Sequence, residues 1–172
     1  HIADHVFSPT DGTRHNYWMQ YINLPDTIES IGEGALSYNS FTSLTIPGSV
    51  KTIGNFAISN CYNLESVTFE DGLVSMGELL FSGCNSLATV KLPSTLQHMG
   101  NNAFISTKLL NDQSSSPIKY ADKWVIATTC YSGDFTVAKG TVGICDHAFF
   151  NLRNGSVTVP KSVKYMGEQC MG

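Results

Sequence analysis

The sequence predicts a stacked solenoid, a β-rich coil in which one short unit is wound repeatedly into rungs. A glycine preceded by an apolar residue recurs at Gly32, Gly54, Gly77 and Gly100, with separations of 22, 23 and 23 residues. Each of these glycines also follows the same apolar pattern. A period of about 20–29 residues is typical of repeats that stack on one another. Cys145 takes the glycine position in a later unit, and Gly167 follows 22 residues after it.

Each unit contains one short strand. We call the recurring glycine, or the cysteine in its place, the anchor residue of a unit. Apolar residues stand ten and eight positions before it, and residues two apart lie on the same side of a strand. The pairs are Ile22 and Leu24, Leu44 and Ile46, Val67 and Phe69, Val90 and Leu92, Phe135 and Val137, and Val157 and Val159. We therefore expect half-buried strands that stack side by side as one parallel sheet.

The remainder of the unit predicts a turn, a second inward-facing side and a corner. Proline follows the strand in four units, as at Pro47, and ends it because proline has no N–H to donate. The anchor glycine permits either a positive φ or close approach between rungs. A small residue and a large one follow, as in Ala57 and Ile58, and we expect a single helical or 3₁₀ turn there. The second inward-facing column is Ile31, Ile53, Met76, Met99, Ile144 and Met166.

The pattern fails between about residues 107 and 134. We expect a short strand at 107–110, a polar loop at 111–117, and a β-hairpin over residues 124–137 that turns at 131–134. The whole chain, 1–172, is predicted to be a single domain with this irregular insert. Because the sequence opens and closes in mid-unit, we expect it to be a fragment of a longer protein.

Composition excludes several classes of function. Charged residues make up 14% of the chain and the net charge is −4 without a basic run, so a nucleic-acid surface is not expected. No apolar segment approaches the roughly 18 residues needed to cross a bilayer. The five cysteines have no metal-ligand spacing. Cys61 and Cys84 share one repeat position, where buried free thiols and a disulfide between neighbouring rungs are both open.

The sequence contains no recognisable catalytic constellation. It has no G-x-S-x-G nucleophile elbow, no dinucleotide-binding G-x-G-x-x-G and no P-loop. His5 and His147 each follow an Asp at the same repeat position, but about six rungs separate them, so they cannot form one metal or acid–base site. We predict a non-enzymatic protein without a cofactor or a metal site.

Two sets of side chains are candidates for binding. The first is the outward face of the strands, which a solenoid presents as a rigid, ordered surface. The alternative is that its threonines are simply good strand formers on a solvated face. This face consists of Tyr21, Asn23, Thr45, Thr68, Lys91, Thr136 and Thr158.

Aromatic residues form the second set. Trp18 and Trp124, with Tyr17 and Tyr21, could anchor a partner or stack on sugar rings. The alternative is that they pack in the core, at the truncated end and under the hairpin.

The repeated unit resembles the BspA-like, or Treponema pallidum-type, leucine-rich repeat. The segments that carry the resemblance are IPGSVKTIGNFAISNCYNLESVTF, LPSTLQHMGNNAFISTKL and the variant WVIATTCYSGDFTVAKGTVGICDHAFFNL. It covers nearly the whole chain; Glu70 in place of proline, Cys145 in place of glycine and Asn39 in place of the corner cysteine depart from it. The resemblance implies a curved leucine-rich-repeat solenoid with one parallel sheet and short helical or 3₁₀ turns.

The same resemblance implies a secreted or surface-exposed bacterial protein that acts in adhesion. Members of this family are similar to adhesins that bind host or matrix proteins, so protein partners are expected. A carbohydrate-binding surface module and a structural spacer are the alternatives. The family has no catalytic residues and no binding motif that could be transferred to positions of this chain.

Overall fold

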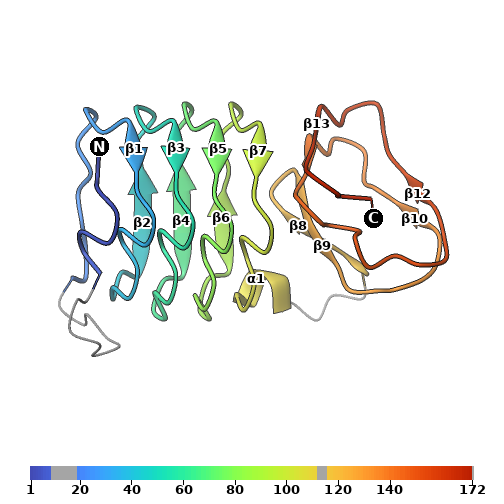
Figure 1. Ribbon diagram of the computed structural model, residues 1–172, viewed down its shortest axis with the longest axis horizontal. Helices are drawn as coiled ribbons and strands as arrows, with labels where there is room; N and C mark the ends of the chain where they lie inside the picture. The colour runs from blue at the N-terminus through green and yellow to red at the C-terminus, as the bar shows by residue number, and fades with distance from the viewer. Residues whose placement is uncertain (9–18, 112–115, 172) are drawn as a thin grey trace.

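The chain forms a row of stacked rungs in which an irregular segment separates two parts (Figure 1). The structure is a computed structural model that describes residues 1–8, 19–111 and 116–171. We call the described residues up to 111 the N-terminal stack and those from 116 onwards the C-terminal stack. One hydrophobic core runs through the rungs of both stacks, from Ile2 to Cys170.

The predicted strands stack as expected in the N-terminal stack. They are β2 (Ser43–Ile46), β4 (Ser66–Phe69) and β6 (Thr89–Lys91), which form a parallel sheet in the order β2-β4-β6. Leu44 pairs with Val67 and Val67 with Val90, and all three side chains are buried. Burial of alternate residues fixes this register, because a slip by one residue would turn the apolar side chains outward. We call this the first sheet.

A second parallel sheet lies on another side of the coil. Its strands are β1 (Ser30–Ile31), β3 (Thr52–Ile53), β5 (Ser75–Met76) and β7 (His98–Met99), in the order β1-β3-β5-β7. The inward column predicted from the sequence supplies its buried residues: Ile31, Ile53, Met76 and Met99 are 3% exposed or less. The repeat pattern predicted that these side chains point inward, but it did not predict that they stand on strands.

Hydrogen-bonded turns form the side of the coil that follows each anchor residue. Within a rung, Ser59 N–H donates to Phe56 O at 2.9 Å, as in a 3₁₀ turn. The turn does not continue into a helix, because Phe56 and Leu79 adopt left-handed φ angles of 55° and 54°. Instead, Phe56 N–H donates to Glu78 O of the next rung at 3.0 Å. Within the described ranges the one α-helix is the short α1 (Lys108–Asn111).

The anchor glycines serve close approach between rungs rather than a positive φ. None of the four in the N-terminal stack has a positive φ, whereas a Cβ on Gly77 would lie 2.6 Å from Asn55 N of the rung below. Cys145 is tolerated at the same position because β9 (Trp124–Thr128), rather than a regular corner, lies beneath it. Its Sγ donates to Ile126 O at 3.1 Å.

The irregular segment differs from its prediction in two respects. Residues 108–111 form α1 rather than a strand, with Thr107 Oγ1 accepting the Leu110 N–H at 3.2 Å. The hairpin joins β8 (Ile118–Ala121) to β9, turning at Asp122 with φ 50°, so the hairpin predicted over 124–137 is wrong. The apolar run 124–128 has the register of a second-sheet strand, and Trp124 pairs in parallel with Gly143.

The C-terminal stack therefore has two separate sheets. β10 (Phe135–Thr136) pairs in parallel with β12 (Val157–Thr158). The other sheet has the order β13-β11-β9-β8, where β11 is Gly143–Ile144 and β13 is Tyr165–Met166. Among the described strands, none of the N-terminal stack pairs with one of the C-terminal stack.

Candidate binding surface

Three of the predicted outward residues form a continuous row on the first sheet. Thr45 of β2 pairs with Thr68 of β4, which pairs with Lys91 of β6. Neighbouring strands lie about 4.8 Å apart, so the three side chains are spaced regularly on a rigid surface. Thr45 and Lys91 are exposed, and Thr68 is half-buried. We call these three residues the first-sheet row.

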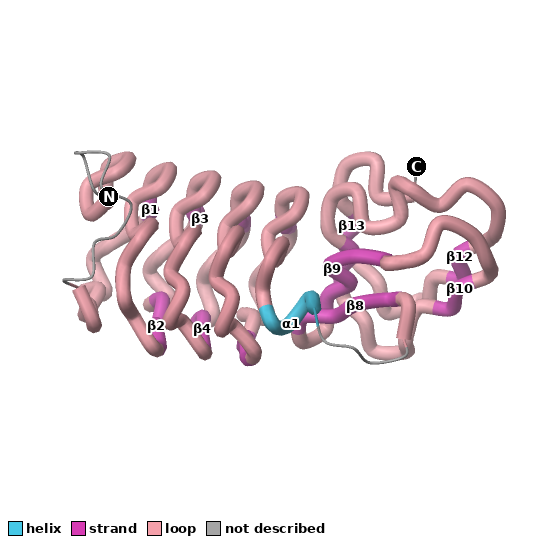
Figure 2. Tube along the Cα trace, turned by 90° about the horizontal axis from the view of Figure 1, so that it is seen from below, coloured by secondary structure: helices cyan, strands magenta, loops and turns pink. Residues whose placement is uncertain are grey.

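The other predicted outward residues do not continue that row. Tyr21, which is 85% exposed, and Asn23 lie before β1 and outside the described strands. Thr136 and Thr158 are exposed but pair with each other on β10 and β12. Figure 2 shows these two strands at the far end of the molecule from β2 and β4, with β8 and β9 in between. The hairpin thus divides the predicted surface into separate parts.

Of the predicted aromatic candidates within the described residues, Tyr21 is exposed and Trp124 is not. Trp124 is 3% exposed, and its ring is stacked on Tyr165 with centroids 6.2 Å apart and an interplanar angle of 4°. A Cβ on Gly143 would lie 2.5 Å from the Trp124 ring, so glycine is required there. Trp124 is therefore a core residue of the C-terminal stack. Trp18 and Tyr17 lie outside the described residues.

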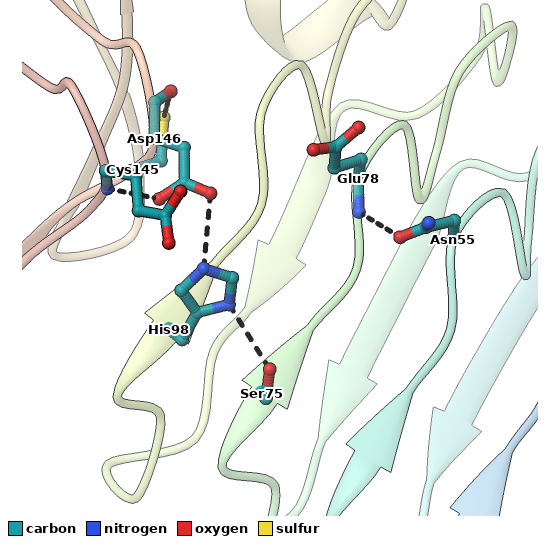
Figure 3. Close-up of polar contacts among 7 residues, drawn as sticks. Asn55, Ser75, Glu78, His98, Cys145 and Asp146 are labelled. Carbon is teal, nitrogen blue, oxygen red and sulfur yellow. Dashed lines mark hydrogen bonds and ion pairs between the residues drawn. The ribbon is translucent and has the colours of Figure 1, made fainter.

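A polar cluster joins the two stacks where β7 faces the segment after β11 (Figure 3). His98 lies 3.2 Å from Ser75 Oγ through Nδ1 and 3.2 Å from Asp146 Oδ2 through Nε2. Asp146 is 7% exposed, and its Oδ1 accepts the Glu168 N–H at 2.8 Å. Asn55 makes the equivalent contact with the Glu78 N–H at 2.9 Å in the N-terminal stack. The cluster is therefore a rung-to-rung cap that also reaches across the junction.

Cys84 and Cys145 are core thiols that are poor nucleophiles. Burial raises the pKa of Cys145 to about 12, and the neighbouring carboxylate of Asp146 adds to the rise. Burial and the neighbouring Cys61 thiol raise the pKa of Cys84 well above its ordinary value. A neutral thiol reacts slowly, so the proximity of Cys145, Asp146 and His98 does not make a catalytic group.

Cys61 and Cys84 are free thiols in the structure, which settles the alternative that the sequence left open. Cys61 Sγ donates to Leu36 O at 3.3 Å and Cys84 Sγ to Ile58 O at 3.0 Å. At the same repeat position, Asn39 Nδ2 donates to Leu36 O at 3.0 Å, and Thr107 Oγ1 donates to Phe104 O at 2.7 Å. In the N-terminal stack this position thus holds a buried donor, which cysteine, asparagine and threonine all supply.

The described ranges contain neither a candidate metal site nor a candidate membrane-spanning helix. No group of three or more His, Cys, Asp or Glu side chains is placed to hold a metal ion there. No helix in the same residues has the length and apolar character to span a membrane.

A cavity of about 220 Å³ lies at the junction between the stacks. Its wall includes Lys123 and Lys164, neither of which was predicted as a site residue. The signal in the sequence is a shared repeat position: Lys164 stands three residues before its anchor residue, and Lys123 stands at the matching place directly before β9.

The repeat seen in the structure is also that of a known family of repeat sequences. The BspA type leucine rich repeat region matches residues 14–131 in six copies. The chain belongs to this family. No curated protein matches the chain at a significant level.

A solved structure of a leucine-rich repeat protein shares this fold. A leucine-rich repeat protein from Bacteroides ovatus is 20% identical with a TM-score of 0.56, over 91% of this chain and 52% of that one. The chain therefore spans about half the length of that protein. A leucine rich cell surface protein from Faecalibacterium prausnitzii is 22% identical with a TM-score of 0.46, over 83% of this chain and 34% of that one. The T. pallidum leucine rich repeat protein is 20% identical with a TM-score of 0.44, over 74% and 52%.

Proposed function

We propose that this chain is a non-enzymatic protein-interaction module of a bacterial cell-surface protein, and that it acts as an adhesin for host or matrix proteins. Membership of the BspA type family supports this proposal, and the similar protein from F. prausnitzii is a leucine rich cell surface protein. The proposed surface is the first sheet, centred on the first-sheet row.

The observation that carries the proposal is the arrangement of the first-sheet row. Thr45, Thr68 and Lys91 are held in register by paired strands over a buried core. The backbone that carries these side chains is already ordered before a partner docks on them. This chain therefore loses little conformational entropy on binding. Hydroxyl groups and one ammonium group provide hydrogen-bond donors and acceptors without a large apolar patch.

The test compares binding to immobilised fibronectin, fibrinogen and a glycan array. Thr68→Arg and Lys91→Glu place bulk and opposite charge in the first-sheet row. Thr136→Arg makes the same type of change on the separate β10–β12 sheet and is the matched control. We expect the first two substitutions to weaken binding to a host protein and Thr136→Arg to leave it unchanged. Equal binding by all variants, or binding to glycans alone, would contradict the proposal.

A further inference from the structure

The cavity at the junction exists because the hairpin replaces one regular turn. In the N-terminal stack the turn after each first-sheet strand is covered by the same turn of the next rung. There, Ser94 N–H donates to Asp71 Oδ1 at 2.6 Å and Gly72 N–H donates to Thr95 Oγ1 at 2.8 Å. No equivalent turn covers the turn at 93–96 in the described structure. The β8–β9 turn meets it only obliquely, with Leu92 N–H donating to Asp122 Oδ2 at 3.4 Å.

One side of this cavity is cationic. Val142 N–H donates to Lys123 O and Lys164 N–H donates to Val142 O, both at 2.8 Å, so the two lysines stand on rungs either side of Val142. Both are exposed and both line the cavity. No carboxylate lies within ion-pair distance of either one among the described residues. Two lysines without counter-ions beside one cavity favour an anionic ligand.

The other sides of the cavity restrict the ligand further. Leu92 and Leu96 line it with apolar side chains, whereas Ser94 and the Asp122 carboxylate present acceptors. A ligand must therefore combine an anionic group with hydroxyl donors and a carbon face. The volume of about 220 Å³ lies below the roughly 300–1,000 Å³ of pockets for drug-sized molecules, so a single ring is the appropriate size.

We propose that this cavity binds a sugar acid, that is, one monosaccharide ring that carries a carboxylate. Lys123 and Lys164 bind the carboxylate, Asp122 and Ser94 accept hydrogen bonds from the hydroxyls, and the side chains of Leu92 and Val142 contact the ring. The ligand can be a free sugar acid or the terminal residue of a glycan, because both present the same group. This site is distinct from the first-sheet row and does not depend on the proposed function.

The experiment titrates the protein with sodium glucuronate and follows backbone amide shifts by NMR. We expect saturable shifts at Lys123, Val142 and Lys164. Glucose, which lacks the charge, should bind at least about tenfold more weakly, because it cannot form charge-assisted hydrogen bonds with the lysines. Methyl glucuronide tests the glycan end: binding equal to that of glucuronate supports a terminal residue, and loss of binding supports the free acid.

Variants connect the binding to the cavity. The double variant Lys123→Met/Lys164→Met keeps the aliphatic stems and should bind glucuronate about tenfold more weakly. Lys51→Met is the matched control, because Lys51 has the same repeat position in the N-terminal stack and should leave binding unchanged. Val142→Phe fills the cavity and should abolish binding, with thermal unfolding checked in parallel.

Four outcomes would overturn the proposal. Glucose could bind as tightly as glucuronate, or the double lysine variant could bind like the parent chain. The shifts could map away from the cavity. Finally, phenylacetate, an aromatic carboxylate without hydroxyls, could bind more tightly than glucuronate, which would remove the argument for a sugar.

Discussion

The N-terminal and C-terminal stacks are built from the same repeat, yet one inward column is covered to different extents along them. In the N-terminal stack the rungs that carry β2, β4 and β6 each contribute a strand to both sheets, and Met76 of β5 is fully buried. In the C-terminal stack Ile144 of β11 is also fully buried, whereas Met166 of β13, in the last described rung, is 54% exposed. An inward position in this repeat is therefore buried by the neighbouring rung as well as by its own.

The hairpin also changes how the sheets continue. It supplies β9 to the second-sheet position, but among the described strands β6 has no neighbour beyond β4. The first sheet therefore ends at β6, and a separate sheet begins with β10. A single irregular segment thus produces the break in the outward row, the polar cluster around His98 and the cavity beside Lys123.

The largest expected effect distinguishes the two methionines. Met76→Ala removes a side chain that is fully buried between rungs, and we expect a loss of about 2–5 kcal/mol in the free energy of unfolding. Met166→Ala at the exposed position should change it by less than about 0.5 kcal/mol. Urea denaturation measures both, and similar losses in the two variants would contradict rung-by-rung burial.

The anchor position gives the second contrast. Gly77→Cys places a Cβ 2.6 Å from Asn55 N, so the backbone has to shift, and we expect destabilisation of about 1–3 kcal/mol. The parent chain already carries Cys145 at this position above β9, without a regular corner beneath it. Thermal unfolding of Gly77→Cys under reducing conditions checks the prediction. An unchanged melting temperature would show that the rungs have room for a side chain at the anchor.

The caps in Figure 3 provide a third, smaller contrast. Asp146→Ala leaves the Glu168 N–H without its acceptor in a mostly buried place, and we expect a loss of about 1–2 kcal/mol. Asn55→Ala removes the same cap at an exposed position and should cost about half a kcal/mol, because water replaces it there. Asp146→Asn, which keeps an acceptor oxygen, is the control. If Asn55→Ala proved the more costly substitution, burial of the cap would not be its main contribution.

The smallest effect is expected on the outward faces. Thr68→Arg and Thr136→Arg alter solvent-facing side chains on two different sheets, and each should change stability by less than about 0.5 kcal/mol. Circular dichroism during heating measures this, and a large loss in either variant would mean that the threonine is structural. Both should remain folded, which makes them suitable for the binding comparison.

The period of the repeat was sufficient to predict the first sheet of the N-terminal stack. Leu44, Val67 and Val90 align because residues in the same column of a solenoid must become neighbours. The same reasoning placed Thr136 and Thr158 on a common face with Thr68, and this failed because counting columns assumes an unbroken stack. The apolar run at 124–128 fits a strand of either sheet, so its partner could not be chosen from the sequence.

The cavity lay beyond sequence reasoning for a related reason. Lys123 and Leu96 line one space only because the hairpin takes the place of a turn, and that replacement is visible in the fold alone. The close approach at the anchor was one of two predicted roles for glycine. The structure distinguishes them through the distance from Gly77 to the rung below.

The interruption in strand pairing between β7 and β9 has a mechanical consequence. If the two ends of the molecule were pulled apart, the load would fall first on the seam between the stacks. Among the described residues, one backbone hydrogen bond crosses this seam, from Asp146 N–H to Met99 O at 3.2 Å, in place of a strand ladder. Each rung released afterwards would lengthen the tether by one repeat, or about 75 Å for 22–23 residues of extended chain. The molecule would then unfold under load one rung at a time rather than all at once.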